Sequence, residues 1–215
     1  MSRRRIAILI SGRGSNMVSL IEAARAPDFP GEIFLVLSNR PDAGGLDLAR
    51  EAGLPALAID HKAYSTRESF EQALDATLTE HGIEFICLAG FMRVLTNWFV
   101  ERWAGRMLNI HPSLLPLFRG TQTHRRALDE GVLVHGCTVH FVVPELDAGP
   151  IVAQAVVPVV PGDTEESLAA RILVQEHKLY PQALRMVCDG SARLENGRVA
   201  FSQSWDAGGA LHSPG

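Results

Sequence analysis

Cysteine is scarce in this sequence, and no long apolar run occurs. The 215 residues contain three cysteines, an odd number and widely separated, which argues against a disulfide framework. We therefore expect Cys87, Cys137 and Cys188 to be reduced thiols in the core of a cytoplasmic protein. The apolar stretch 6–10, behind three arginines, is too short for the core of a signal peptide. We expect no membrane-spanning segment.

A strong excess of charge is also missing. The formal net charge of -4 and the isoelectric point near 6.1 give no electrostatic case for nucleic acid or an anionic membrane as the main partner. Hydrophobic residues make up 47% and charged residues 20% of the chain, which is typical of a globular protein. One domain is expected, with two small domains as the alternative, and the chain has no internal repeat.

Apolar segments of strand length alternate with amphipathic segments in the first half. Their hydrophobicity is continuous, which predicts parallel strands buried on both faces with helices on either side. The expected strands are 5–10, 32–39, 55–60, 84–90 and 106–110, and the expected helices are 16–25, 45–52 and 67–81. We expect Gly53 to end the second helix, and Ser65 with Glu68 to form a capping box for the third. The fold class is therefore α/β, with a mostly parallel, doubly wound sheet.

The pattern changes after Pro116. Segments 135–142 and 151–160 are joined by a short polar loop, which predicts antiparallel strands at the C-terminal edge of the sheet. A long helix is expected to open near Asp163 or Thr164, and Pro181 should end or kink it. We expect a single domain over 1–201 and a flexible tail over 202–215.

A glycine-rich turn, "ISGRGSNM", lies between the first strand and the first helix. Free backbone N–H groups at such a helix start can bind an anion. Only part of the dinucleotide fingerprint is present, because Met17 takes the third glycine position and no acidic residue ends the second strand. This favours a single phosphomonoester over NAD. A plain tight turn, with Ser15 or Asn16 as the N-cap, is the alternative, and the loop alone leaves both open.

"LNIHPSLLP" places Asn109 and His111 on the same side of an extended chain, where a strand should end. An amide can stabilise a developing oxyanion and a histidine can transfer protons, which suits a reaction through a tetrahedral intermediate. Asp147, in "ELDAGP", is the best candidate for orienting the histidine. Ser113 lacks a nucleophile-elbow pattern, so the attacking group would belong to a substrate. A buried histidine, a capping asparagine and an ordinary turn aspartate are the alternatives.

Three potential metal ligands, His135, Cys137 and His140, occur close together in one predicted strand. The first two share a face of that strand and His140 takes the other face, so the three side chains cannot converge on one ion. No zinc site is expected here.

The segments "GRGSN", "LAGFMRVL", "NIHPSLLP" and "LDAGP", in this order within 5–190, resemble the phosphoribosylglycinamide formyltransferase family. The resemblance implies the formyltransferase fold, with a nucleotide-binding half over about 1–105 and a folate-binding and catalytic half over 106–201. It implies transfer of the formyl group of 10-formyltetrahydrofolate to the glycine amine of 5′-phosphoribosylglycinamide in purine biosynthesis, without a metal. The implied partners are these two small molecules, not nucleic acid or membrane, and the chain would be a monomer or homodimer.

The resemblance also implies roles for individual residues. The ribonucleotide would be bound by Gly14, Ser15, Asn16 and Glu176. The folate would be bound by Arg67, Met92, Arg93, Val94, Leu95 and Asn109. Catalysis would fall to Asn109, which stabilises the oxyanion, to His111, which transfers a proton, and to Asp147, which holds His111 in its useful tautomer and charge state.

One segment departs from the family pattern. After "LLP" the chain has Leu117-Phe118-Arg119-Gly120, where members of the family carry a lysine or tyrosine and a second proline. The "RG" is closer to methionyl-tRNA formyltransferase, which shares the Asn-His-Asp chemistry. A formyltetrahydrofolate deformylase, which gives the formyl group to water, and a non-catalytic nucleotide-binding module are two further alternatives.

Overall fold

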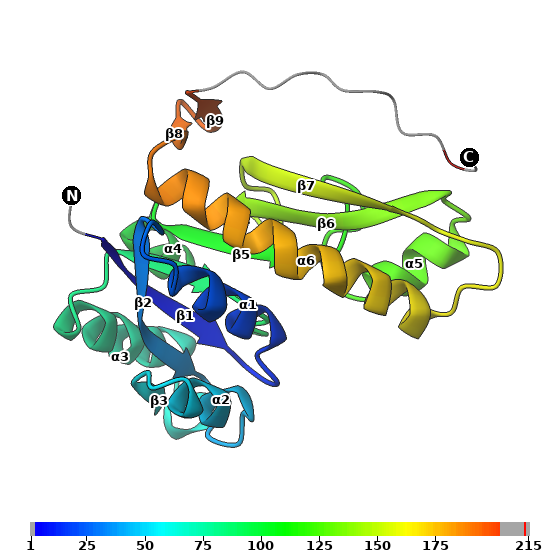
Figure 1. Cartoon of the computed structure of the whole chain (residues 1–215). Coiled ribbons are helices and arrows are strands. Elements are labelled where there is room, and N and C mark those ends of the chain that lie inside the picture. Colours follow the sequence, from blue (N-terminus) through cyan, green and yellow to red (C-terminus); the bar gives the residue numbers. More distant parts are fainter. Residues whose placement is uncertain (1–2, 203–212, 214–215) are drawn as a thin grey trace.

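A computed structural model describes residues 3–202 and 213 (Figure 1). Seven strands form one sheet in the order β3-β2-β1-β4-β5-β6-β7. Neighbouring strands are parallel from β3 to β5, and β6 and β7 add antiparallel pairs at one edge. The predicted fold class is therefore confirmed. The sheet strands are β1 Arg4–Ile10, β2 Gly31–Ser38, β3 Ala56–Ala58, β4 Phe85–Leu88, β5 Met107–His111, β6 Val134–Phe141 and β7 Ile151–Pro158.

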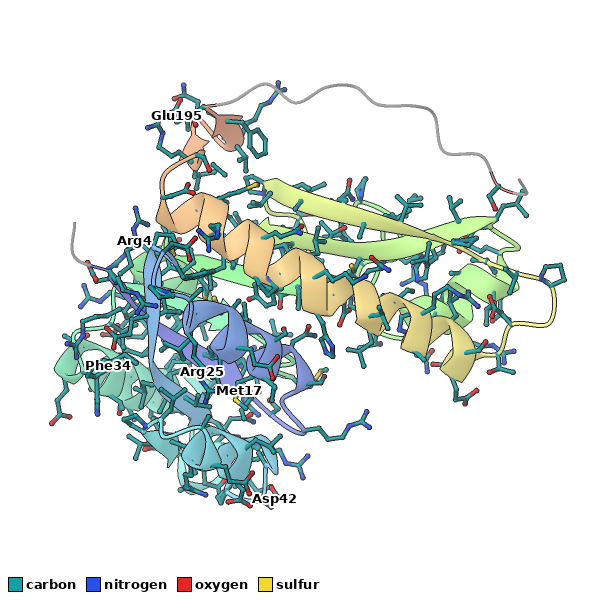
Figure 2. The ribbon with its side chains drawn as sticks, in the orientation of Figure 1. Arg4, Met17, Arg25, Phe34, Asp42 and Glu195 are labelled. Carbon is teal, nitrogen blue, oxygen red and sulfur yellow. The ribbon has the colours of Figure 1, made fainter. Side chains whose placement is uncertain are left out.

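Helices cover both faces of this sheet. They are α1 Ser15–Ala24, α2 Gly45–Glu51, α3 Arg67–Glu80, α4 Asn97–Arg102, α5 Thr123–Asp129 and α6 Glu165–Cys188, with a short 3-10 helix, η1, at His61–Ala63. Residues of α1, α2 and α6 pack on one face, and residues of α3 and α4 pack on the other. Side chains fill the space between the layers (Figure 2), and Met17 of α1 is fully buried there.

The β1 strand shows why its hydrophobicity is continuous. Ile6, Ile8 and Ile10 face the core under α1 and α6, whereas Ala7 and Leu9 face the core under α3 and α4. Each of the five side chains is fully buried. A strand with two buried faces has no polar alternation, which is the pattern from which the parallel sheet was predicted.

Helix α6 corrects one prediction. Its N-cap is Thr164, whose hydroxyl accepts a hydrogen bond from the Ser167 N–H, and the helix continues to Cys188. Pro181 was expected to end or kink this helix. The helix does not end there, because Pro181 lies inside it. Tyr180 is fully buried, and its hydroxyl lies 3.1 Å from the carbonyl oxygens of both Leu88 and Leu108. This packing against β4 and β5 outweighs the hydrogen bond that proline removes.

Other local expectations met mixed outcomes. Gly53 has φ +82 directly after α2, so its role as a helix stop is confirmed. The capping box of α3 is formed by Thr66 and Ser69, not by Ser65 and Glu68. Neither α5 nor the separate hairpin of β8 Ala192–Glu195 and β9 Arg198–Phe201 was expected from the sequence.

The three cysteines are free and buried, as predicted. Within 3–202, no helix is long and apolar enough to cross a membrane. The predicted tail, 202–215, lies outside the described residues apart from Ser202 and Ser213.

Candidate active site

The glycine turn leaves the start of α1 open. Gly14 is the N-cap of α1, with φ +76, and no side chain caps the helix. A Cβ atom on Gly14 would lie 3.0 Å from the Met17 Cε and 3.1 Å from the Gly45 Cα. Because no side chain caps the helix, its first N–H groups have no side-chain partner, and free N–H groups at a helix start can bind an anion. The alternative, with Ser15 or Asn16 as the N-cap, is not what the turn forms.

Two of the predicted ribonucleotide ligands meet across the molecule. The Asn16 Nδ2 donates a hydrogen bond of 2.7 Å to the Glu176 Oε2, so that α1 and α6 are joined at this point. Both side chains are buried, and the Asn16 Oδ1 has no hydrogen-bond partner among the described residues. Burial raises the pKa of the Glu176 carboxyl, and the hydrogen bond from Asn16 opposes that shift.

A cleft of about 500 Å³ opens beside the glycine turn at the carboxyl ends of β1, β2 and β4. Its lining holds the guanidinium groups of Arg13, Arg40 and Arg93 and the imidazole of His61, but no carboxylate. This charge suits an anionic ligand. The cleft is lined by residues 11–16, 39–40, 61, 89–90 and 92–93, which include the predicted ligands Gly14, Ser15, Asn16, Met92 and Arg93.

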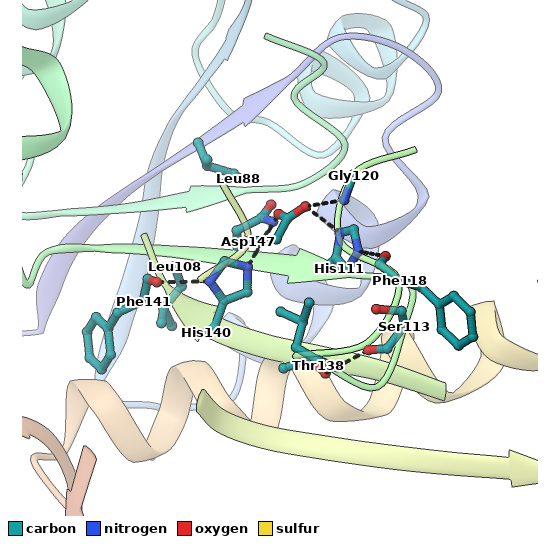
Figure 3. A network of polar contacts seen from close by, with 12 residues as sticks. Leu88, Leu108, His111, Ser113, Phe118, Gly120, Thr138, His140, Phe141 and Asp147 are labelled. Atoms are coloured by element: carbon teal, nitrogen blue, oxygen red, sulfur yellow. Dashed lines mark hydrogen bonds and ion pairs between the residues drawn. The ribbon is translucent and has the colours of Figure 1, made fainter. Parts of the chain in front are cut away.

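Two of the predicted catalytic residues, His111 and Asp147, come together at the end of β5 (Figure 3), and Asn109 lies two residues before His111 on the same strand. His111 is 6% exposed, and its Nδ1 lies 3.4 Å from the Asp147 Oδ2. Its Nε2 lies 3.0 Å from the Phe118 carbonyl oxygen. A carbonyl oxygen only accepts hydrogen bonds, so Nε2 carries a proton. The Asp147 carboxylate lies beside the other ring nitrogen, Nδ1, and can fix the orientation of the ring.

Asn109 is held by a histidine that the sequence reasoning considered only as a metal ligand. Asn109 is paired with His140 across β5 and β6, and its Nδ2 lies 3.3 Å from the His140 Nε2. The His140 Nδ1 donates to the Phe141 carbonyl oxygen, 2.9 Å away. Burial lowers the pKa of His140, so the ring is neutral and Nε2 is left as an acceptor for the amide. One N–H of Asn109 is thereby used, and the second has no partner within the described part of the chain, which leaves it for a ligand.

Backbone geometry brings Asp147 to this cluster. Asp147 has φ 50, in the left-handed region, and its side chain is 8% exposed. Two residues later, a Cβ atom on Gly149 would lie 1.7 Å from the Phe141 carbonyl oxygen, so only glycine fits this close approach. The loop therefore folds back tightly onto β6.

Segment 117–120, which differs from the family pattern, takes part in this network through its backbone. Its Phe118 carbonyl oxygen accepts from His111, and its Gly120 N–H donates to the Asp147 Oδ2 at 2.8 Å. The Arg119 side chain pairs with Glu145 on the same loop as Asp147, 2.7 Å away. Since the contacts to the catalytic pair come from backbone atoms, other side chains in this segment can leave those contacts intact.

Three predicted folate ligands remain. Among the described residues, no hydrogen bond links these three to Asn109, His111 or Asp147. Arg67 is exposed on the first turn of α3, Val94 is exposed, and Leu95 is buried in the core under α3 and α4. β1, β4 and β5 are parallel neighbours, so the glycine turn, the loop after β4 and His111 all follow the same edge of the sheet.

Comparison with known proteins identifies the family. Residues 4–184 match the formyl transferase family. The phosphoribosylglycinamide formyltransferase of Escherichia coli is 43% identical over 189 residues, which cover 88% of this chain and 89% of that protein. The chain belongs to the phosphoribosylglycinamide formyltransferase family.

A relative of different length and a solved structure extend this finding. The bovine trifunctional purine biosynthetic protein adenosine-3 is 50% identical over 200 residues, which cover 93% of this chain but 20% of that protein. The chain thus spans about a fifth of the length of that relative. The crystal structure of glycinamide ribonucleotide transformylase 1 from Symbiobacterium toebii has a TM-score of 0.90 and 46% identity, covering 93% of this chain and 94% of that one. The structure therefore has the formyltransferase fold that the sequence resemblance implied.

Proposed function

We propose that this chain transfers the formyl group of 10-formyltetrahydrofolate to the glycine amine of 5′-phosphoribosylglycinamide. The observation that carries the proposal is the cluster of Asn109, His111 and Asp147 at the sheet edge that also holds the open start of α1. A proton-transfer group and an amide donor lie there, and the hydroxyl of nearby Ser113 is already bonded to the Leu117 carbonyl oxygen. The reaction therefore needs an amine that a substrate supplies.

The ribonucleotide is proposed to bind through its phosphate at Gly14, Ser15 and Asn16. The uncapped N–H groups of α1 supply donors, and the cationic lining of the cleft supplies charge. Glu176 is proposed to contact the ribose, since its carboxylate is held toward the turn by Asn16. These two contacts would fix both ends of the phosphoribosyl group and leave the glycine amine to reach the catalytic cluster.

The folate is proposed to bind along the loop after β4, at Met92, Arg93, Val94 and Leu95, with Arg67 and Asn109 beside it. Met92 and Val94 are 79% and 53% exposed, which is unusual for large apolar side chains and suits an aromatic ligand. Arg67 is an exposed cation, suited to a glutamate carboxylate of the folate.

In the proposed reaction, the glycine amine attacks the formyl carbon and a C–N bond forms. Asn109 donates its free N–H to the oxyanion of the tetrahedral intermediate, a contribution of about 10²- to 10³-fold in rate. His111 transfers the proton that the amine loses to the leaving nitrogen of tetrahydrofolate, and Asp147 orients the ring. The C–N bond to tetrahydrofolate then breaks, and no metal takes part.

The chain is proposed to act in the cytoplasm, where buried free thiols stay reduced. The sequence predictions of a monomer or homodimer, and of a functional boundary near residue 105, remain part of the proposal.

Substrate dependence tests the function directly. Purified protein is expected to release tetrahydrofolate only when 10-formyltetrahydrofolate and 5′-phosphoribosylglycinamide are both present. Release without the amine would indicate a deformylase, and ribonucleotide binding without folate binding would indicate a non-catalytic module.

His111→Ala is expected to lower kcat by about 10²- to 10⁴-fold, with the fold intact by circular dichroism. Near-normal turnover of that variant would overturn the role of His111.

A further inference from the structure

Ser11 connects the two parts of the proposed site. It follows β1 directly, is the second residue of the glycine turn "ISGRGSNM" and is 5% exposed. Its N–H donates to the Gly90 carbonyl oxygen at 3.2 Å, and its hydroxyl oxygen accepts from the Met92 N–H at 2.8 Å. This residue of the glycine turn therefore holds the backbone of the loop after β4 by two hydrogen bonds.

Asn39 orients the Ser11 hydroxyl. The hydroxyl donates to the Asn39 Oδ1 at 2.5 Å, and Asn39 is 4% exposed. A hydroxyl has one hydrogen, so this bond leaves the lone pairs of the oxygen for the Met92 N–H. Asn39 is itself anchored, because the His61 Nδ1 lies 2.8 Å from its carbonyl oxygen and can donate to it. Ser11 is thus the centre of a buried chain that links the ends of β1 and β2 to the loop after β4.

The far end of the same loop is held by Glu71 of α3. Glu71 is 1% exposed, and its carboxylate accepts from the Thr96 N–H at 2.9 Å and from the Thr96 hydroxyl. The loop backbone is therefore fixed at both ends, whereas the Met92 and Val94 side chains remain exposed. Exposed apolar groups on a fixed backbone are already arranged for a ligand and need little ordering on binding.

We propose that Ser11 is a positioning residue whose hydroxyl, oriented by Asn39, keeps the 92–95 loop in the shape that binds the folate ring. The inference rests on the proposed function, and it adds a residue outside the catalytic cluster and outside the predicted ligand set. Because the hydroxyl is bonded to the loop, its removal should weaken folate binding more than ribonucleotide binding.

The test compares Ser11→Ala with Ser38→Ala. Ser38 is 2% exposed at the end of the neighbouring strand β2, and its hydroxyl bonds to the backbone of Arg40 instead of Met92. By calorimetry with a non-reactive folate analogue, Ser11→Ala is expected to weaken binding about tenfold, the equivalent of one buried hydrogen bond. Ser38→Ala should keep affinity for the analogue within about twofold, and in Ser11→Ala the affinity for the analogue should fall more than the affinity for the ribonucleotide.

A double variant separates positioning from general loss of stability. Asn39→Ala should also weaken binding of the analogue, and Ser11→Ala with Asn39→Ala should bind no more weakly than Ser11→Ala alone, because both remove one interaction. If Ser11→Ala fails to fold, Ser11→Cys keeps the size while weakening the acceptor, and the same loss is expected.

The outcomes separate this inference from the function on which it rests. If the unmodified protein does not bind the folate analogue, the proposed function itself would be overturned. If the unmodified protein binds the folate analogue and Ser11→Ala binds it equally tightly, only the role of Ser11 would be overturned. Equal losses in the Ser11 and Ser38 variants, or additive losses in the double variant, would also overturn it.

Discussion

His140 is the residue that fixes the Asn109 amide. With its Nδ1 hydrogen donated to Phe141, the neutral ring offers Nε2 to the Asn109 N–H at 3.3 Å. His140→Phe would keep the ring volume but remove that acceptor, so the amide could turn away from the oxyanion. We expect kcat to fall about tenfold, the equivalent of one buried hydrogen bond, with both KM values nearly unchanged. Steady-state kinetics on both substrates measure this.

The matched comparison is Asn109→Ala, which should cost about 10²- to 10³-fold in kcat because it removes the oxyanion donor itself. Adding His140→Phe to that variant should change little further, since both act through one amide. A kcat in His140→Phe equal to that of the unmodified protein would rule out the positioning role.

At this scale the sequence predicted some contacts and could not predict others. Period-2 alternation placed Asn109 and His111 on one side of β5, and the structure agrees. The contact with His140 depends on the antiparallel register of β5 and β6, in which Asn109 is opposite His140. No residue pattern fixes that register before the strands pair, so His140 was considered only for a metal site.

At the scale of elements, the start of α6 depends on one hydroxyl. The Thr164 side chain accepts from the Ser167 N–H, and the Ser167 side chain bonds back to the Thr164 backbone. Thr164→Ala removes this capping box and is expected to lower the free energy of unfolding by about 1 kcal/mol, measured by urea denaturation. Thr79→Ala, at an exposed position of α3, is the control and should cost nothing, because alanine favours helix. Equal effects of the two substitutions would show that the cap contributes nothing specific.

Element boundaries show where local sequence signals lose to packing. The patterns of α1, α2 and α3 were sufficient to place them, since each has one apolar face and a recognisable start or stop. Pro181 suggested an end to α6, but Tyr180 and Leu184 are buried on the sheet and hold the helix together past it. The short helix α5 has seven residues and was missed, because so few residues give no clear period.

At the scale of the whole molecule, the order of strands explains why the two proposed half-sites are neighbours. β1 pairs with both β2 and β4, and β4 pairs with β5, so the sheet continues across the proposed functional boundary near residue 105. Buried continuous strands made the parallel sheet predictable from the sequence. The β8–β9 hairpin was not predictable in the same way, because its strands of four residues are mostly exposed or half-buried and lack a strong apolar pattern.

The stability of the whole fold should fall with acidification because of His135. Its ring is fully buried between Phe118 and His124, and both ring nitrogens lack a hydrogen-bond partner among the described residues. Burial, and then the neighbouring His124, lower the pKa of His135 to about 4. Between that value and the unfolded pKa of about 6.5, the unfolded chain binds a proton that the folded chain does not, so stability decreases as pH falls.

His135→Phe isolates this effect, since the phenyl ring keeps the aromatic contacts and cannot be protonated. Near pH 7 the variant should be as stable as the unmodified protein or more so, because a buried polar ring without partners is replaced by an apolar one. Between about pH 6.5 and 4.5 its advantage in the free energy of unfolding should grow by about 1 to 3 kcal/mol, measured by urea denaturation at each pH. The carboxylates and His124 are present in both proteins, so their titration largely cancels in the difference. Parallel stability curves for the two proteins would mean that His135 accepts a proton in the fold as readily as in the unfolded chain.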